Sequence, residues 1–307
     1  MAFVYDLESF RIGEQPAWPL VYKRYKKPVR PVPIFGLESL VKMRDDWHPD
    51  QLKAIDRHFN WMVRVVTDDQ QGAAGVILPR LDDSFFINLR NSYGEYKHRP
   101  AEGQYLAAGK DYYVEKDLTY PTLDQRVALC MSLVKGMGLL HRAGVVYGDL
   151  SLRNFLYRLS PTPAVIYVDT DAMRPKGSTS VFSLQPHTPD WEPPEALAAK
   201  RKGDGIGFAV QNFNTDRYKL GLAILRILAD VPRAAEVLLE VDAIVAERVR
   251  RLAPCAADGF PDLGGGGHDL PLARAPAGAV VETELLPEAA LARAERPVRT
   301  RVTVPRG

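Results

Sequence analysis

The sequence has little cysteine and almost no net charge, and both shortages narrow the class of protein. Its 307 residues include two cysteines, Cys130 and Cys255, which lie far apart and have no histidine at metal-ligand spacing. We therefore expect neither a disulfide scaffold nor a zinc cluster. Lys and Arg number 40 against 38 Asp and Glu, a formal charge of +2. This balance predicts no basic surface for nucleic acid or for an acidic membrane.

Long apolar runs are also missing. The most apolar stretch, residues 220–231, is interrupted by Arg226 and Asp230, and it is far shorter than the roughly 20 residues that span a bilayer. The N-terminus carries Asp6 and Glu8 where a secretory signal has basic residues before an apolar core. We therefore expect a cytoplasmic protein with no membrane partner.

Enough apolar residues, 46% of the chain, are present for one large domain or two smaller ones. Aromatic and β-branched residues predict a strand over 18–25, and amphipathic patterns predict helical segments within 37–59. Two β-rich runs, 61–66 and 73–78, flank the polar turn DDQQG and predict a hairpin.

The clearest helical pattern lies between residues 122 and 144. Its apolar residues recur at alternating steps of four and three, at Leu123, Val127, Cys130, Val134 and Met137. Residues 82–121 have weak periodicity and predict mostly connections with short helical pieces. Beyond the long helix we expect three short strands, over 145–147, 155–159 and 165–168. Two helices should follow, over 216–229 and 233–252.

Three oxygen-bearing side chains have a spacing that suits phosphoryl transfer. In the segment YGDLSLRNFLYRLSPTPAVIYVDTDAM, Asp149 follows a short apolar strand, Asn154 comes five positions later, and Asp169 ends the next strand. One carboxylate orients an attacking hydroxyl and accepts its proton, while an amide oxygen and a second carboxylate hold the magnesium that bridges nucleotide phosphates. Taken singly, such residues more often cap a loop or form a turn.

This segment resembles the catalytic and metal-binding loops of the protein-kinase-like superfamily, whose pattern is H-R-D-x-x-x-x-N followed by D-F-G. The two Asp and the Asn match in spacing, whereas the His, the Arg and the Phe-Gly do not. The phrase GDL-x-x-x-N beside V-D-T-D is most similar to a divergent bacterial branch. The resemblance covers about residues 15–252. It implies an α+β, bilobal protein-kinase-like fold with a small β-rich N-lobe over 1–81 and a larger, mainly helical C-lobe over 82–252.

The resemblance further implies an ATP- and Mg²⁺-dependent phosphotransferase that acts on a hydroxyl of a protein or a small molecule. Asp149 would orient and deprotonate the acceptor hydroxyl. Arg153, at the place where tyrosine kinases keep an arginine, would offset charge on the transferring group. Asn154 and Asp169 would bind the metal, and Lys23, in a V-Y-K sequence similar to V-A-I-K, would contact the α- and β-phosphates.

Several of these assignments leave alternatives open. Lys23 also lies in a basic run typical of a solvated strand. The acidic partner that the resemblance gives to Lys23 is Glu38, although Asp45 and Asp46 lie on the same helical stretch. Asp171 is interpreted as a turn residue, with a second metal-facing carboxylate as the alternative.

Three other segments occur in the order that the resemblance implies. Leu78-Pro79-Arg80-Leu81 resembles the hinge that receives adenine, and since proline has no N–H, a neighbouring backbone N–H would be the donor. The run DWEPPE resembles the A-P-E segment, with Glu195 expected in a structural ion pair. Asp216 resembles the buried aspartate that holds the catalytic loop through its backbone amides.

Two departures from the family pattern support a rival hypothesis. Only Gly13 is present in the first 22 residues, so the Gly-rich loop is truncated or replaced. Gly148 stands where many kinases keep the arginine that grips a phosphorylated activation loop, so regulation by loop phosphorylation is not expected. The alternative function is therefore a pseudokinase that acts as a nucleotide-binding or scaffold module.

Lysine and aromatic residues are scarce at the C-terminal end. No lysine follows Lys219, and Phe260 is the only aromatic residue beyond it. We interpret residues 253–307 as a low-complexity, loosely structured tail. One alternative is that this segment results from GC-rich DNA translated in a shifted reading frame, in which case the tail is not native. The other is that Arg296 is the late arginine that pairs with Glu195, in which case the reading frame is correct.

Overall fold

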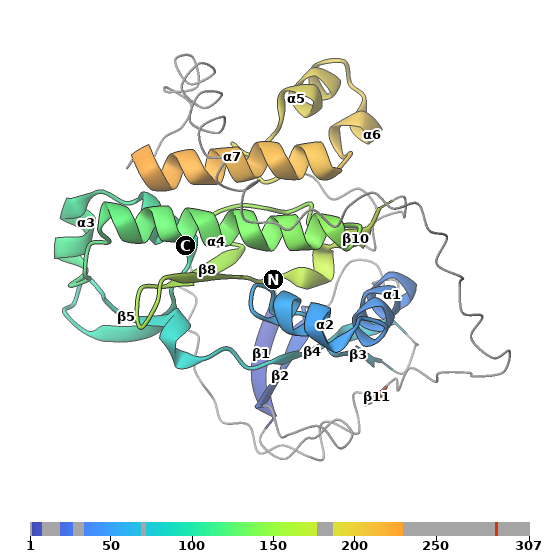
Figure 1. Cartoon of the computed structure of the whole chain (residues 1–307), viewed down its shortest axis with the longest axis horizontal. Coiled ribbons are helices and arrows are strands. Elements are labelled where there is room, and N and C mark those ends of the chain that lie inside the picture. Colours follow the sequence, from blue (N-terminus) through green and yellow to red (C-terminus); the bar gives the residue numbers. More distant parts are fainter. Residues whose placement is uncertain are drawn as a thin grey trace, which may run out of the picture. The chain divides into compact units, whose positions relative to one another are not determined.

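The computed structural model describes residues 2–7, 19–26, 34–68, 72–176, 187–229 and 286–287. Contacts divide the chain into two units, Met1–Pro232 with Leu285–Gly307, and Arg233–Glu284, and every described residue belongs to the first unit. The expected helix over 233–252 lies outside the described residues, as does the expected tail except for 286–287. The first unit combines strands and helices in an α+β arrangement (Figure 1).

A five-stranded sheet forms the N-terminal part of this unit. Neighbouring strands pair in the order β1-β2-β4-β3-β11, and only the β11–β3 pair is parallel. The strands are β1 (Ala2–Leu7), β2 (Leu20–Tyr25), β3 (Arg64–Thr67), β4 (Ala73–Pro79) and β11 (Leu286–Pro287). The predicted strand over 18–25 and the predicted hairpin are therefore confirmed as β2 and as the β3–β4 pair.

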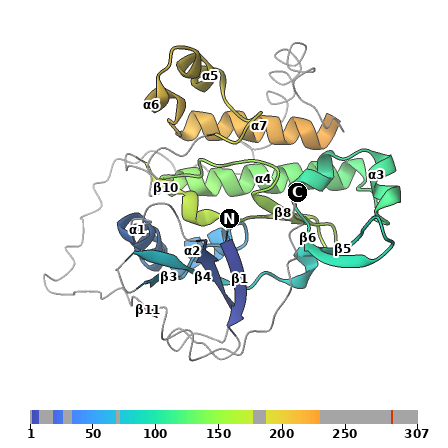
Figure 2. The same ribbon diagram turned by 180° about the vertical axis from the view of Figure 1, so that it is seen from behind.

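Two helices follow β2 in the chain: α1 (Ile34–Asp45) packs against β3 of this sheet (Figure 2), whereas α2 (Pro49–Asp56) contacts α4, described below. Helix α1 buries Leu37, Leu40, Val41 and Arg44, a spacing that places all four on one helical face. The Trp61 indole N–H donates to the carbonyl of Leu40 at 3.1 Å, which ties α1 to the segment before β3. The helix begins at Ile34, three positions before the predicted start.

The segment from 82 to 121 contains short helices, as predicted, and a hairpin that the sequence pattern did not indicate. Strands β5 and β6 pair antiparallel with Asn88 opposite His98 and Leu89 opposite Lys97. Most of their side chains are exposed or half-buried and polar, so the apolar alternation that marks a half-buried strand is weak. The elements are η1 (Asp83–Phe85), β5 (Phe86–Arg90), β6 (Tyr96–Pro100), η2 (Gly103–Ala107) and α3 (Lys110–Glu115).

The predicted long helix is α4 (Leu123–Arg142). Thr122 and Gln125 form a reciprocal capping box at its start, and Gly144 has a positive φ of 75° just after its end. Leu123 and Val127, which the periodicity placed on the apolar face, are exposed. The buried face instead starts with Arg126, Leu129 and Cys130 and continues toward the C-terminal end.

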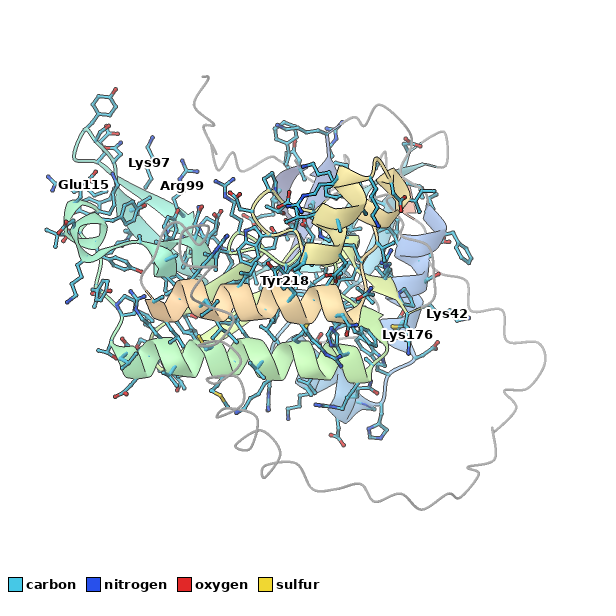
Figure 3. The ribbon with its side chains drawn as sticks, turned by 90° about the horizontal axis from the view of Figure 1, so that it is seen from above. Lys42, Lys97, Arg99, Glu115, Lys176 and Tyr218 are labelled. Atoms are coloured by element: carbon cyan, nitrogen blue, oxygen red, sulfur yellow. The ribbon has the colours of Figure 1, made fainter. Side chains whose placement is uncertain are left out.

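Helix α7 (Phe213–Ala229) runs beside α4, as Figures 1 and 3 show. The Arg126 guanidinium of α4 donates to the carbonyls of Leu106 and Ile227, at 2.8 and 2.6 Å, and so joins η2 to both helices. The predicted helix over 216–229 is confirmed. The remaining elements are β7 (Val145–Val146), β8 (Phe155–Arg158), β9 (Ala164–Tyr167), η3 (Thr170–Ala172), β10 (Arg174–Pro175), α5 (Pro194–Arg201) and α6 (Gly205–Phe208).

Candidate active site

Asp216 of α7 holds the loop that carries Asp149. The Asp216 carboxylate accepts the backbone N–H groups of Tyr147 and Gly148, both at 2.8 Å, and His141 Nε2 lies 3.0 Å from it. Asp216 is completely buried, and a buried carboxylate is tolerated only when donors of this kind satisfy it. The contacts are those that the sequence resemblance implies for this aspartate, and they position the backbone immediately before Asp149.

Two donors orient the Asp149 carboxylate. Thr188 Oγ1 donates to Oδ1 and Asn154 Nδ2 donates to Oδ2, both at 3.0 Å. Burial raises the pKa of Asp149, although the hydrogen bond from Thr188 and the nearby Lys219 ammonium oppose the shift. A carboxylate that is fixed in orientation and has a raised pKa suits the role of general base.

Asn154 donates through its amide nitrogen, and its side-chain oxygen accepts no hydrogen bond from the residues that the structure describes. Its Nδ2 donates both to the carboxylate and to the backbone carbonyl of Asp149. Its own backbone carbonyl accepts from the Tyr147 hydroxyl at 2.7 Å and from the Val168 N–H at 3.0 Å. The second contact places Asn154 against the residue that immediately precedes Asp169.

Asp169 lies at the end of β9 in the left-handed region, with a φ of 55°. Few residues other than glycine adopt this region, and Asp and Asn do so most readily. The Asp169 side chain is 51% exposed, and its Oδ1 lies 2.8 Å from Lys23 Nζ. The predicted metal ligand is therefore accessible and close to the predicted phosphate-binding lysine.

Lys23 lies on β2 and points at two carboxylates. Its ammonium is 2.8 Å from Asp169 and 2.7 Å from Asp171, and its side chain is only 15% exposed. Burial alone would lower the pKa of Lys23, but the charges of Asp171 and then Asp169 outweigh it, and the pKa is raised. Lys23 is thus a charged, largely buried lysine, and the alternative of a solvated strand position does not describe it.

Glu38, the glutamate expected to pair with Lys23, does not contact it. Glu38 lies on α1 and makes no ion pair with any residue that the structure describes. Asp45 faces Arg64 at 3.6 Å. Asp171, which we interpreted as a turn residue, does lie in the short helix η3, but its carboxylate binds Lys23.

The predicted hinge, residues 78–81, begins with the last two residues of β4. The Arg80 N–H donates to the Pro19 carbonyl at 2.7 Å, whereas the Leu81 N–H faces no acceptor among the described residues. Leu81 packs against a small apolar cluster that is separate from the main core and includes Leu156. Leu78 is buried in the main core. Of the two predicted adenine contacts, Leu81 therefore combines an available donor with an apolar neighbour.

Arg153 is exposed on the same loop as Asp149 and Asn154. Its Nε donates to Gln104 Oε1 at 3.1 Å, and Gln104 belongs to η2. The backbone N–H of Arg153 also donates to Ser151 Oγ, at 3.3 Å. This anchoring keeps the guanidinium beside the loop, and no described residue accepts a hydrogen bond from its other donors.

Within the described residues, the segment that resembles A-P-E is held by Arg226 of α7, and the predicted pairing of Glu195 with Arg296 stays a prediction. Glu195 is exposed at the start of α5 and has no ion pair among the described residues, while Arg296 lies outside them. Arg226 donates to the Asp190 carbonyl at 2.8 Å and stacks on the Trp191 ring, 4.4 Å from its centroid.

Two residues of this region were not found from the sequence. Thr188 is a loop residue with no pattern to mark it, and only its contact with Asp149 identifies it. Lys219 is completely buried and donates to the Gly148 carbonyl. Its signal in the sequence was a lysine three positions after Asp216, on the helical face that carries Leu222 and Ala223 into the core.

The residues present fit a magnesium ion better than a soft metal. Within the described ranges no group of three or more His, Cys, Asp or Glu side chains is placed to hold a metal. The Asn154 amide and the Asp169 carboxylate supply only oxygen donors, which Mg²⁺ prefers, and Mg²⁺ usually keeps several waters and substrate oxygens as its other ligands.

None of the described helices combines the length and apolar character needed to cross a membrane.

Comparisons with known proteins give a limited structural likeness. No family model matches the sequence, and no curated protein matches it. Among solved structures, the kinase domain of a specific rhoptry antigen from Toxoplasma gondii superimposes with a TM-score of 0.45 and 14% sequence identity. The alignment covers 69% of this chain and 59% of that kinase domain.

Proposed function

We propose that this protein is an ATP- and Mg²⁺-dependent phosphotransferase that transfers the γ-phosphate to a hydroxyl group. The observation that carries the proposal is the continuous set of contacts from Lys23 to Asp149. Lys23 contacts Asp169, the residue before Asp169 donates to Asn154, and Asn154 donates to Asp149. Phosphoryl transfer requires a phosphate-binding cation, oxygen ligands for magnesium and a base for the acceptor, placed next to one another in this order in space.

Each residue then has one role. Asp149 accepts the proton of the acceptor hydroxyl, since its carboxylate is oriented by two donors and burial raises its pKa. Asn154 and Asp169 hold the metal through their oxygens, and bound magnesium neutralises charge on the phosphates. Lys23 holds the α- and β-phosphates, and Arg153 offsets charge on the transferring group.

The nucleotide base would lie against the Leu81 cluster. The Leu81 N–H, which meets no acceptor among the described residues, is a donor for an adenine ring nitrogen, and the half-buried side chain of Val168 in the same cluster offers apolar surface for the ring. This arrangement requires a cleft between a β-rich N-lobe and a helical C-lobe. The two-lobe organisation is part of the proposal.

One observation favours the second candidate, a pseudokinase used as a binding module. Both Asp169 and Asp171 engage Lys23, so phosphates would have to compete with two carboxylates for its ammonium. The predicted replacement of the Gly-rich loop points the same way, although Gly13 lies outside the described residues.

Phosphate transfer separates the two candidates. The purified chain is incubated with labelled ATP and Mg²⁺, alone and with whole-cell lysate, and labelled products are counted. We expect transfer that Asp149→Asn and Asp169→Asn each reduce by ~100-fold or more, while Asp46→Asn on an exposed site has no effect. Unchanged activity in the first two variants would refute the catalytic assignment. Nucleotide binding without transfer to any acceptor would favour the pseudokinase.

A further inference from the structure

The two carboxylates that contact Lys23 differ strongly in exposure. The Asp169 side chain is 51% exposed, whereas that of Asp171 is 9% exposed, although their distances to the ammonium are nearly equal, 2.8 and 2.7 Å. A metal ligand must reach a solvent-accessible ion together with the oxygens of its substrate, but a buried lysine needs a counter-ion in the protein interior. The difference in exposure therefore suits two different tasks.

Asp171 is held in place from more than one side. It lies in η3, whose first residue, Thr170, donates through its hydroxyl to the Asn60 carbonyl at 2.8 Å. Burial raises the pKa of the Tyr25 hydroxyl, and the nearby Asp171 charge raises it further. Tyr25 and Lys23 are two positions apart on β2, so both side chains leave the same face of the strand toward Asp171.

The backbone between the two aspartates explains how both reach one lysine. Asp169 adopts the left-handed conformation, and η3 begins at the next residue. This reversal directs two carboxylates that are separated by a single residue toward the same ammonium. In a regular strand, side chains two residues apart leave the same face about 7 Å from each other, so they would not converge on a single ammonium.

We infer that Asp171 is a positioning residue, the resident counter-ion of Lys23, in the place that the family resemblance gives to Glu38 of α1. Asp171 keeps the Lys23 ammonium in the site, and Asp169 is thereby left to exchange the lysine for the metal. This inference rests on the proposed function, and it assigns to η3 a task that the resemblance assigned to a helix beside the sheet.

The first test uses the full chain without nucleotide and measures thermal unfolding. If Lys23 and Asp171 are partners, Asp171→Asn lowers the melting temperature in the wild-type background. It has little effect, or the opposite effect, when Lys23→Met is already present. Glu38→Gln is the matched control and should show no such coupling to Lys23→Met. Equal shifts by Asp171→Asn in both backgrounds, or coupling of Glu38 instead, would overturn the inference.

The second test separates a positioning role from metal ligation. Titration of ATP at saturating Mg²⁺ should show that Asp171→Asn weakens nucleotide binding by about tenfold or more, with the Mg²⁺ half-saturation unchanged. Asp169→Asn should instead raise the Mg²⁺ requirement. A raised Mg²⁺ requirement in Asp171→Asn would identify Asp171 as a metal ligand and overturn the inference, as would equal weakening by Glu38→Gln.

The two tests also separate failure of the inference from failure of the proposed function. A wild-type chain that binds no ATP refutes the proposed function, and the unfolding measurements still decide whether Lys23 and Asp171 are partners. A chain that binds ATP equally well with Asp171→Asn refutes the inference and leaves the proposed function standing.

Discussion

The ammonium of Lys219 lies 2.6 Å from the carbonyl oxygen of Gly148, the residue immediately before Asp149. Lys219 is completely buried and also donates to Gln211 Oε1 at 3.2 Å. Burial lowers its pKa to about 8, and the charges of Asp149 and Asp216 oppose the shift. A cation from α7 thus supports the backbone of the loop that carries Asp149.

Replacing Lys219 by methionine should destabilise the fold. The Gly148 carbonyl and the Gln211 side chain would lose a buried donor, which costs about 1–3 kcal/mol of unfolding free energy. Denaturant unfolding of Lys219→Met measures the loss. Lys53→Met on the exposed surface of α2 is the control and should change stability by less than about 0.5 kcal/mol. A more stable Lys219→Met would mean that burying the ammonium is a net cost to the fold.

The Asp216 carboxylate should be needed for the loop as a whole. Asp216→Asn keeps the size of the side chain but turns an N–H₂ group toward one of the backbone N–H donors of Tyr147 and Gly148. We expect a loss of about 2–4 kcal/mol in unfolding free energy, together with loss of phosphate transfer. Urea denaturation measures the first effect and labelled ATP the second. Asp46→Asn serves as the exposed control, and wild-type stability in Asp216→Asn would show that these hydrogen bonds are dispensable.

His187 should make the fold sensitive to acid. Burial lowers its pKa to about 4, and its Nδ1 lies 3.2 Å from Gln211 Nε2. Between pH 6.5 and about 4 the unfolded chain binds a proton that the folded chain does not, so stability falls as the pH is lowered through this window. Removing this group should reduce the fall by about 1–3 kcal/mol.

The measurement is unfolding free energy between pH 7 and pH 4 for the wild type and for His187→Gln. Other groups titrate in the same window, so His48→Gln, whose side chain is 75% exposed, controls for the general effect of losing a histidine. The expected result is a shallower pH dependence in His187→Gln alone. Parallel curves for all three proteins would contradict the assigned pKa direction.

Gly103 should not tolerate a side chain, because η2 passes very close to β8, the strand that follows the loop carrying Asp149. A Cβ at Gly103 would lie 2.2 Å from the Phe155 ring and 2.9 Å from the Leu152 carbonyl oxygen. Gly103→Ala should therefore cost about 1–3 kcal/mol of stability and, by moving the residue next to Asn154, lower phosphate transfer.

Gly109 is the matched control on the same stretch of chain. A Cβ at this position meets nothing within 4 Å, and its φ of −68° suits any residue. Gly109 is the N-cap of α3, where Ala is less favourable than Gly, and this cost opposes the gain of about 1 kcal/mol that Ala brings through the unfolded chain. Gly109→Ala should therefore change stability by less than about 1 kcal/mol. Comparable melting temperatures for the Gly103→Ala and Gly109→Ala proteins would show that the contact with Phe155 is not tight.

Local patterns of the sequence were sufficient to predict helix α4 and the β3–β4 hairpin, and to single out Asp149, Asn154 and Asp169 by their spacing. Each of these depends on residues within one element or one loop, where capping, turn composition and apolar periodicity act directly on the backbone. The β5–β6 hairpin escaped the same reasoning because its strands are mostly polar and exposed. The lobe boundaries at 81 and 252 stay predictions.

Contacts between distant segments decided the rest. Lys23 and Asp171 are 148 positions apart, and the choice of Asp171 over Glu38 depends on how β2 lies against η3. Lys219 reaches Gly148 across 71 positions because α7 lies against the loop that carries Asp149. The amino-acid sequence alone sets which oxygen-bearing side chains the loop carries and how far apart they lie, because those residues are neighbours in the chain. Packing of the fold sets which lysines lie next to them, because a buried charge interacts with groups that are close in space, however distant they are in the sequence.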